Sequence, residues 1–444
     1  MLILLRCCKP RLPYIDALSR TSSTATTTRH ALSSSLVIRR SHRFHSTSST
    51  SDGSLHRVDD GVPFFPIYYN DIYEVDLPPG HRFPMWKYRK VRELVQAKVG
   101  GSGGLTDEDD DARRRVYCDF RVSPLATRED LITTHEANYV YRYLHGEMTE
   151  SENRNIGFPW SHQHVNRTLS SVGGTVAAAC ASWEEYARRH ERLLDDYDAN
   201  TDRMPMVLNE SNKHLCWAAH VAGGTHHAFK DYGEGFCIFS DIAVAANVLL
   251  KKYSQSSPEN SSSPSIHRIL IIDLDVHQGN GNAALFQNDD RVQTFSMHCS
   301  GNYFSKKETS NLDVELPVGC NDETYLSTLR YWLRRIEQHD FDATIDIDKP
   351  STETRRKNFD LIFFQAGVDI HNDDRLGRLC ITTSGISQRN LMVYEFAHRM
   401  KCPLVITMGG GYPNGNGKEG SSSIIEAHTR VYCDAYEFLT TAYR

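Results

Sequence analysis

Four consecutive apolar residues, Ile269 to Ile272, run directly into two carboxylates and an imidazole. The apolar run has the length and composition of a parallel strand that is buried on both faces. Asp273, Asp275 and His277 follow at every second position, so an extended chain would direct all three side chains to one face. Burying two carboxylates without a cation is costly, and ligands gather at the carboxyl ends of parallel strands. The pattern therefore predicts a metal site at a strand end; the alternative is a solvated strand end with unrelated polar residues.

Three further apolar segments indicate the rest of the sheet. Leu361–Phe364 and Leu404–Thr407 are short and rich in β-branched or aromatic residues, and longer helix-compatible stretches separate such runs. Val62–Tyr69 has the composition of a first strand, so the folded domain is expected to open near residue 60. This alternation predicts an α/β fold with one mostly parallel central sheet flanked by helices.

A further carboxylate, Asp369, lies shortly after the run Leu361–Phe364. An aspartate that follows a strand is more often a turn residue or a helix cap, so by itself it is a weak signal. Together with Asp275 and His277 it supplies one imidazole and two carboxylates, a set that leaves room for water on a metal ion. Zinc takes such ligands in catalytic sites, and iron or manganese would also fit.

Two adjacent histidines and one tyrosine lie near glycine-rich segments. His226 and His227 follow Gly223–Gly224, and neutral imidazole is well suited to move a proton near pH 7. The alternatives to proton transfer are that the two histidines are metal ligands or ordinary surface residues. Gly409–Gly411 precede Tyr412 and lack the Lys-Ser/Thr of a phosphate-binding loop. We expect a mobile loop that presents the tyrosine hydroxyl to a substrate carbonyl.

Charge and hydropathy argue against two classes of function. The chain has 444 residues and a formal net charge of -6, which gives no basic footprint for direct binding of nucleic acid. Its longest apolar runs are far shorter than the roughly 20 residues that cross a bilayer, so no membrane span is expected.

Residues 1–50 differ in composition from the rest, since they are rich in Arg, Ser and Thr and contain a single acid, Asp16. This composition predicts a mitochondrial presequence, and residues 43–46 resemble a processing site. The alternatives are a plastid presequence, or a disordered basic tail on a nuclear or cytoplasmic protein. Residues 60–440 are expected to form one catalytic domain with surface insertions near residues 100–111, 254–265 and 339–358.

Five segments, in this order along the chain, together resemble the zinc-dependent histone deacetylases of the arginase/deacetylase superfamily. They are Gly223–Ala228, Gly235–Cys237, Asp273–Gly281, Ala366–Gly377 and Gly409–Tyr412. The likeness spans roughly residues 60–440 and implies a single-domain arginase/deacetylase-like fold. Within the family, Gln278–Gly281 and Asp373–Gly377 look most like class IV and its bacterial and plant relatives.

The resemblance implies a role for the matched metal-site residues. Asp275, His277 and Asp369 would bind one zinc ion, which acidifies a water molecule and polarises the acyl carbonyl. Tyr412 would donate a hydrogen bond to the oxygen that becomes negative in the tetrahedral intermediate. Members of the family also hold a structural monovalent cation, such as K⁺, near the zinc-bearing strand, and the same is expected here.

The resemblance also gives the two histidines different tasks. His227 would accept the proton of the water molecule and return one to the leaving amine, while His226 with Asp273 would tune the charge of the pair. Class I members usually carry aspartate where this sequence has Asn280. His227 would then have a neutral partner, so the two imidazoles should differ in basicity.

The activity implied by the resemblance is hydrolysis of acylated lysine in proteins, by a deacetylase or a long-chain deacylase. Phe236 beside Gly235 would form one wall of the tunnel for the acylated chain, and small residues around Gly233 would leave its foot open. The opposite wall stays unassigned near Asn302–Phe304. The nearest alternative is a small-molecule amidohydrolase, which cleaves acylated amines such as acetylpolyamines on the same fold. A ureohydrolase would need a second metal, and a catalytically silent acyl-lysine-binding protein is disfavoured because Tyr412 and all three ligands are present.

Overall fold

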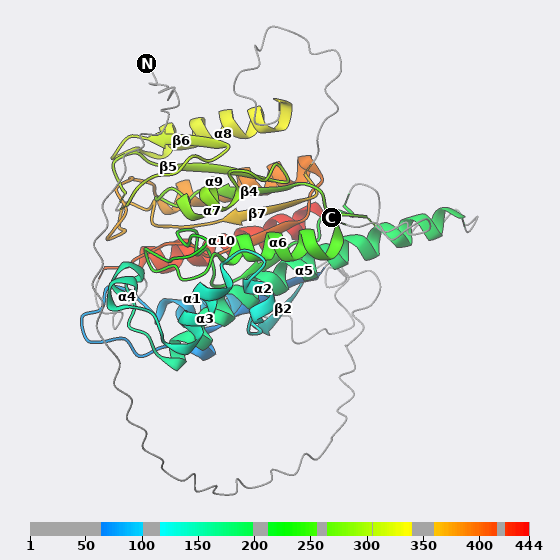
Figure 1. The fold of residues 1–444 in the computed structure, drawn as a ribbon. Helices are drawn as coiled ribbons and strands as arrows, with labels where there is room; N and C mark the ends of the chain where they lie inside the picture. The colour runs from blue at the N-terminus through cyan, green and yellow to red at the C-terminus, as the bar shows by residue number, and fades with distance from the viewer. Residues whose placement is uncertain are drawn as a thin grey trace, which may run out of the picture. The chain divides into compact units, whose positions relative to one another are not determined.

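The computed structural model describes residues 64–100, 116–198, 212–254, 264–303, 305–339, 359–414 and 422–443, all within one unit of the chain, Arg57–Arg444. A parallel eight-stranded sheet lies at its centre (Figure 1). The strands are β1 (Phe64–Tyr69), β2 (Tyr117–Val122), β3 (Ala218–His220), β4 (Ile269–Asp273), β5 (Val292–Cys299), β6 (Leu312–Leu316), β7 (Leu361–Gln365) and β8 (Leu404–Thr407). Their order across the sheet is β2-β1-β3-β8-β7-β4-β5-β6.

The apolar runs identified in the sequence form the buried centre of this sheet. Every residue of β4, β7 and β8 is buried, as expected for strands that are covered on both faces. In the register of the sheet, Asp273 lies opposite Gln365, and Gln365 lies opposite Thr407, so the three strands end at the same level. The predicted α/β fold with a mostly parallel sheet is confirmed.

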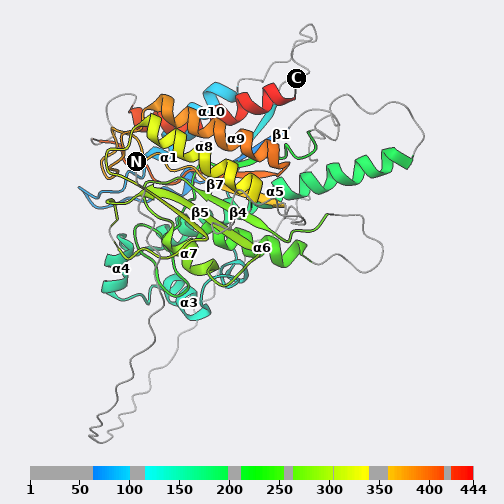
Figure 2. The ribbon, with the colours of Figure 1, turned by 90° about the horizontal axis from the view of Figure 1, so that it is seen from above.

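Helices cover both faces of the sheet. They are η1 (Asp71–Tyr73), α1 (Lys87–Val99), α2 (Arg128–Leu131), α3 (Ala137–His145), α4 (Glu150–Ile156), α5 (His162–Asp198), α6 (Asp241–Tyr253), α7 (Asn280–Phe286), α8 (Asp322–His339), α9 (Thr383–Met400) and α10 (Ser423–Ala442). On one face α5 packs against α6 and against β1, β3 and β8. On the other face α9 packs between α8 and α10, and α10 also contacts α1 (Figure 2).

Consecutive residues of β4 point into different hydrophobic cores. Ile269 and Ile271 pack in the cluster that contains residues of α5 and α6, whereas Leu270 and Ile272 pack in the cluster that contains residues of α9 and α10. Both faces of the strand are therefore used for packing. Polar chemistry begins only at the last residue of the strand, Asp273.

The strand order reverses at β4, and this reversal locates the site. The chain passes from β4 to β5 and β6 on one side, and then returns to pair β7 with the other side of β4. Open parallel sheets bind their ligands at such a switch point, outside the carboxyl ends of the strands. The loops that follow β4, β7 and β8 start at this edge.

Several predictions from the sequence fall outside the described residues. They are the presequence at residues 1–50 and most of the insertions at residues 100–111, 254–265 and 339–358. The limits of the catalytic domain, residues 60–440, likewise stay a prediction. Among the helices that the structure describes, none combines the length and the hydrophobicity that crossing a membrane requires.

Candidate metal centre and active site

Three side chains meet beyond the carboxyl ends of β4 and β7. Asp275, His277 and Asp369 are buried, and one potential ligand atom of each lies within 4.8 Å of the other two. The Nδ1 atom of His277 is 3.3 Å from Oδ1 of Asp275 and 3.4 Å from Oδ2 of Asp369. The three predicted metal ligands, which come from two loops, are therefore adjacent in space.

The route of the chain to this cluster differs from the one expected. The strand ends at Asp273, and the chain bends from Asp275 onwards, so the prediction of an extended segment through His277 is wrong. Leu274 and Val276 are nevertheless buried in the core, which leaves the polar residues on the other side. The bend also lets the backbone N–H of Val276 donate a hydrogen bond of 2.9 Å to Oδ1 of Asp369, which ties the two ligand loops together.

The surroundings of the cluster fit a bound cation. Among the described residues, Oδ2 of Asp369 is buried and has no hydrogen-bond partner. Burial, and then the charge of Asp275, raise the pKa of Asp369 to about 6. A Cβ atom on Gly410 would lie 2.1 Å from this oxygen and 2.8 Å from Oδ2 of Asp275, so the glycine keeps the space beside both carboxylates clear. Two carboxylate oxygens and one imidazole nitrogen are ligands that zinc accepts.

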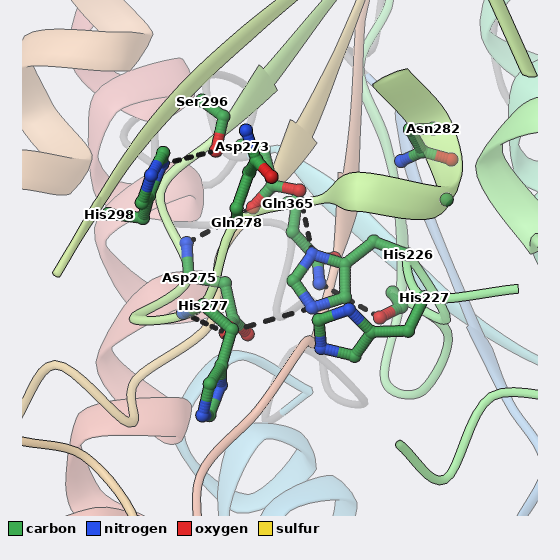
Figure 3. A network of polar contacts seen from close by, with 12 residues as sticks. His226, His227, Asp273, Asp275, His277, Gln278, Asn282, Ser296, His298 and Gln365 are labelled. Carbon is green, nitrogen blue, oxygen red and sulfur yellow. Dashed lines mark hydrogen bonds and ion pairs between the residues drawn. The ribbon is translucent and has the colours of Figure 1, made fainter. Parts of the chain in front are cut away.

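The two histidines lie beside Asp275 and His277 (Figure 3). The rings of His226 and His227 are 4.0 Å apart between centroids. The Nδ1 atom of His226 is 2.7 Å from Oδ2 of Asp273, and its Nε2 atom is 3.7 Å from Oδ1 of Asp275. The Nδ1 atom of His227 is 2.8 Å from Oδ1 of Asn280. The pairing expected for each histidine is thus present in the structure.

These partners give the two imidazoles opposite tendencies. Burial opposes the charging of His226, but the carboxylates of Asp273 and Asp275 outweigh it and raise the pKa of His226 to about 9. Burial is the largest effect on His227 and lowers its pKa well below the ordinary value. The two pKa values are therefore shifted in opposite directions, because Nδ1 of His226 pairs with a carboxylate whereas Nδ1 of His227 pairs with a neutral amide.

Asp241, the first residue of α6, holds the turn that leads to the histidines. Its carboxylate accepts hydrogen bonds from the backbone N–H groups of Gly224 at 2.9 Å and Thr225 at 2.7 Å. Gly224 has a φ of 81°, and a Cβ there would lie 2.2 Å from the side chain of Gln365. Only glycine satisfies both conditions at this position. Sequence reasoning missed Asp241, because an aspartate at the start of a helix has the appearance of an ordinary cap.

Aromatic side chains cluster around Tyr412. The ring centroid of Phe236 is 6.1 Å from that of Tyr412 and 5.2 Å from that of Phe83, which in turn is 4.9 Å from that of Phe158. Burial raises the pKa of Tyr412 well above its ordinary value, and the charges of Asp369 and Asp275 add to this effect. The phenol is therefore a neutral hydrogen-bond donor.

The loop before Phe236 rests on the end of α4. The backbone N–H of Gly235 donates to the carbonyl of Asn155 at 3.2 Å, and that of Phe236 donates to Ile156 at 2.8 Å. A Cβ on Gly233 would lie 2.4 Å from the carbonyl oxygen of Cys237. Gly233 is therefore tightly packed against the backbone of Cys237, and an open tunnel foot around Gly233 and Gly235 stays a prediction.

A second side chain at the site was missed by sequence reasoning. Tyr303 lies with its ring centroid 6.0 Å from that of His227 and 6.5 Å from that of His277. It belongs to the segment after β5 in which no tunnel wall was assigned. A tyrosine in a loop carries no local signal of such a position.

The fold and this geometry define a class of protein. A buried cluster of carboxylates and imidazole at the switch point of a parallel sheet, with a histidine pair and a phenol beside it, is the arrangement of a metal-assisted hydrolase. Sequence comparison then gives the family, since a family model described as "Histone deacetylase domain" matches residues 86–428. The chain belongs to the histone deacetylase family and is by that membership a hydrolase of amide bonds.

Individual relatives extend the comparison. An uncharacterized protein of Picosynechococcus sp. is 36% identical over 348 residues, which cover 78% of this chain and 92% of that protein. Histone deacetylase 2 of Arabidopsis thaliana is 30% identical over 213 residues, and the match covers 47% of each chain. The chain thus spans about half the length of this second relative.

Solved structures agree on the fold. The structure of an HDAC homolog complexed with SAHA has a TM-score of 0.54 and 20% identity, over 85% of this chain and 84% of that one. The structure of an HDAC homolog from Aquifex aeolicus has a TM-score of 0.54 and 18% identity, over 84% of each chain. The predicted arginase/deacetylase-like fold is confirmed, whereas the likeness to class IV stays a prediction.

Proposed function

We propose that this protein is a zinc-dependent hydrolase of acyl-lysine amides. The observation that carries the proposal is the buried cluster of Asp275, His277 and Asp369 with the pair His226 and His227 next to it. When bound to these three ligands, zinc would supply Lewis acidity to the amide carbonyl and acidify a water molecule. A monovalent cation near β4 stays a prediction.

We assign the proton transfers to the chain's own residues. His227, whose Nδ1 atom pairs with the neutral amide of Asn280, takes the proton from the attacking water and returns a proton to the leaving amine nitrogen. His226, which pairs with Asp273 at 2.7 Å, stabilises negative charge as it develops on the substrate. Tyr412 donates its hydroxyl proton in a hydrogen bond to the carbonyl oxygen. Its backbone N–H donates a 2.6 Å hydrogen bond to Asp374, which supports a fixed position for the residue.

The aromatic cluster supports an acylated, chain-like substrate. Phe83, Phe158 and Phe236 form a cluster of rings, and Phe83 and Phe236 also contact the ring of Tyr412. Rings of this kind bind methylene groups, and each buried methylene contributes about 0.8 kcal/mol. We propose that the enzyme accepts long fatty-acyl groups as well as acetyl groups. Only binding energy that is realised in the transition state would raise the rate for the longer chains.

A reconstitution assay tests this function. The full-length protein is stripped with a chelator, reloaded with Zn²⁺ or Fe²⁺, and assayed on acetyl-, octanoyl- and myristoyl-lysine peptides and on an acetylpolyamine. We expect turnover of the peptides that returns with the metal. Turnover of the acetylpolyamine alone would replace this proposal by the small-molecule alternative, and a steady fall of kcat/KM with chain length would restrict the enzyme to deacetylation.

We also propose that the protein acts in mitochondria. The support is the basic, acid-poor composition of residues 1–50. A fusion of residues 1–60 to a fluorescent protein should enter mitochondria and be trimmed. Import into plastids would identify a different organelle, and diffuse nuclear or cytosolic fluorescence would argue against a presequence. If the fusion enters mitochondria, mitochondrial acyl-proteins would be better substrate candidates than histones.

A further inference from the structure

Both the oxygen and the nitrogen of the Asn280 side-chain amide form hydrogen bonds. It is the first residue of α7 and is fully buried. Its Oδ1 atom lies 2.8 Å from Nδ1 of His227 and also accepts a hydrogen bond of 3.0 Å from the backbone N–H of Gly281. Its Nδ2 atom donates to Oε1 of Glu234 at 2.8 Å and, at a longer 3.3 Å, to the backbone carbonyl of Lys306. The amide therefore connects His227 to a carboxylate that the catalytic scheme does not use.

Glu234 is itself held in place. It lies in the tight turn before Phe236, where the backbone N–H of Cys237 donates to the Glu234 carbonyl at 2.9 Å. Its second carboxylate oxygen accepts a hydrogen bond of 2.8 Å from the hydroxyl of Ser305. Each oxygen of this half-buried carboxylate thus faces one donor, and the group has a defined orientation toward Asn280.

The chemistry of these donors and acceptors fixes the proton on His227. An ionised carboxylate only accepts hydrogen bonds, so the NH₂ end of the Asn280 amide must face Glu234. The oxygen end then faces His227, and an oxygen can pair with Nδ1 only if that nitrogen carries the proton. In the neutral ring the lone pair is consequently on Nε2. The backbone donor of Gly281 agrees with the same orientation of the amide.

We propose that Glu234 is a positioning residue that orients the Asn280 amide and thereby keeps a proton on Nδ1 of His227. Its effect on the rate rests on the proposed function, in which the Nε2 atom of His227 accepts a proton. The effect of Glu234 on the position of the imidazole proton does not depend on the proposed function.

The same contact explains why asparagine and not aspartate suits position 280. An aspartate there would place a second carboxylate about 2.8 Å from Glu234, at the site of the present hydrogen bond. Two carboxylates at this distance repel unless they share a proton. The pair would then turn apart and release Nδ1 of His227. The two side chains are therefore compatible in the wild type and in the double variant Glu234→Gln/Asn280→Asp, but not in the single variant Asn280→Asp.

Kinetics of a double-mutant cycle test this proposal in the full-length, zinc-loaded protein. Asn280→Asp should lower kcat by about 10- to 100-fold, as for other groups that orient a catalytic ligand, with KM and zinc content unchanged. Glu234→Gln should be mild, because glutamine still accepts from Asn280. The double variant Glu234→Gln/Asn280→Asp should regain most of the lost kcat, since the two sites are in contact and couple. Glu308→Gln is the matched control, because Glu308 is a nearby carboxylate that pairs with Lys306.

A direct measurement separates this proposal from the proposed function. ¹⁵N spectra of histidine-labelled protein, with the His227 signals assigned from a His227→Gln variant, should show the neutral ring protonated on Nδ1. Glu234→Ala should shift His227 toward a mixture of the two tautomers. A double variant no more active than Asn280→Asp, or a wild-type His227 protonated on Nε2, would overturn the positioning role. Absence of turnover in the wild type would count against the proposed function, and the spectra would still decide this inference.

Discussion

The ammonium group of Lys87 donates a hydrogen bond of 2.9 Å to the carbonyl oxygen of Gly411, the residue before Tyr412. Lys87 is buried, and its charge also lies 5.2 Å from the ring centroid of Tyr412 and 5.3 Å from that of Tyr88. Burial lowers the pKa of Lys87 to about 8, against the opposing effect of nearby carboxylates. A buried cation thus fixes the backbone that presents the phenol.

Replacing this cation should therefore impair catalysis without removing the metal. We expect Lys87→Met to lower kcat by at least about tenfold, since a hydrogen bond to a charged group contributes on the order of 1.5 to 3 kcal/mol. Steady-state kinetics with elemental analysis for zinc provide the measurement. Lys90→Met, at an exposed position of the same helix, is the control. Equal kcat values for both variants would mean that the Lys87 contact does not position Tyr412.

Removal of a ligand should abolish metal binding and activity together. Asp369→Ala or His277→Ala leaves two of the three ligands, so the affinity for zinc should fall by at least about tenfold. Elemental analysis after dialysis against a weak chelator measures the loss. Asp373→Asn is a matched control, because this exposed aspartate on the same loop accepts a hydrogen bond from Ser423 instead. Full zinc occupancy in Asp369→Ala would refute the metal assignment.

Removal of the phenol hydroxyl should separate catalysis from metal binding. Tyr412→Phe keeps the ring in its aromatic cluster and loses only the donor, so we expect normal zinc content and a kcat lower by about 10²-fold or more. The KM for an acyl-lysine peptide should change little. A variant as fast as the wild type would exclude Tyr412 from oxyanion stabilisation.

The pH dependence of stability should report on a buried histidine remote from the metal. His135 pairs through Nδ1 with the carbonyl of Phe229 at 2.8 Å, and its Nε2 accepts from the N–H of Ser240 at 3.0 Å, so the neutral ring is the form that fits. Burial lowers the pKa of His135 from 6.5 to about 4. Between these values the unfolded chain binds more protons, and stability is lost as the pH falls through this window, by about 1.4 kcal/mol per pH unit.

Urea unfolding at pH 7.5 and 5.5 measures this contribution. The difference in unfolding free energy between the two pH values should be smaller in His135→Gln than in the wild type. His145→Gln, at an exposed position, should leave the difference unchanged. An identical difference in His135→Gln and the wild type would show that the ring is not held neutral by the fold.

The sequence was informative where the signal is local. The apolar runs that became β4 and β7 place Asp275 and Asp369 within a few residues of a strand end, and the strands are neighbours. Because parallel strands end at one edge, two short segments were sufficient to bring the ligands together. The bend after Asp273 could not be read from the sequence, since alternating polar residues suit a continuing strand equally well.

Contacts between remote segments left no trace in the sequence. Lys87 and Gly411 are 324 positions apart, and a lysine at the start of a helix has the appearance of a surface residue. Glu234 likewise reads as part of a polar turn, and its contact with Asn280 depends on how two loops pack. Tyr303 is a third example. The positions of these side chains at the site depend on tertiary packing, which cannot be inferred from periodicity or spacing in the sequence.

The position of β8 has a consequence for how the sheet is completed. β8 pairs with β3 on one side and β7 on the other, so it joins the three strands β2, β1 and β3 to the four strands β7, β4, β5 and β6. A chain that ends before Leu404 would therefore leave the edges of β3 and β7 without their partner strand, and such edges can pair with other chains. The last strand to be synthesised is thus the one that closes the centre of the sheet.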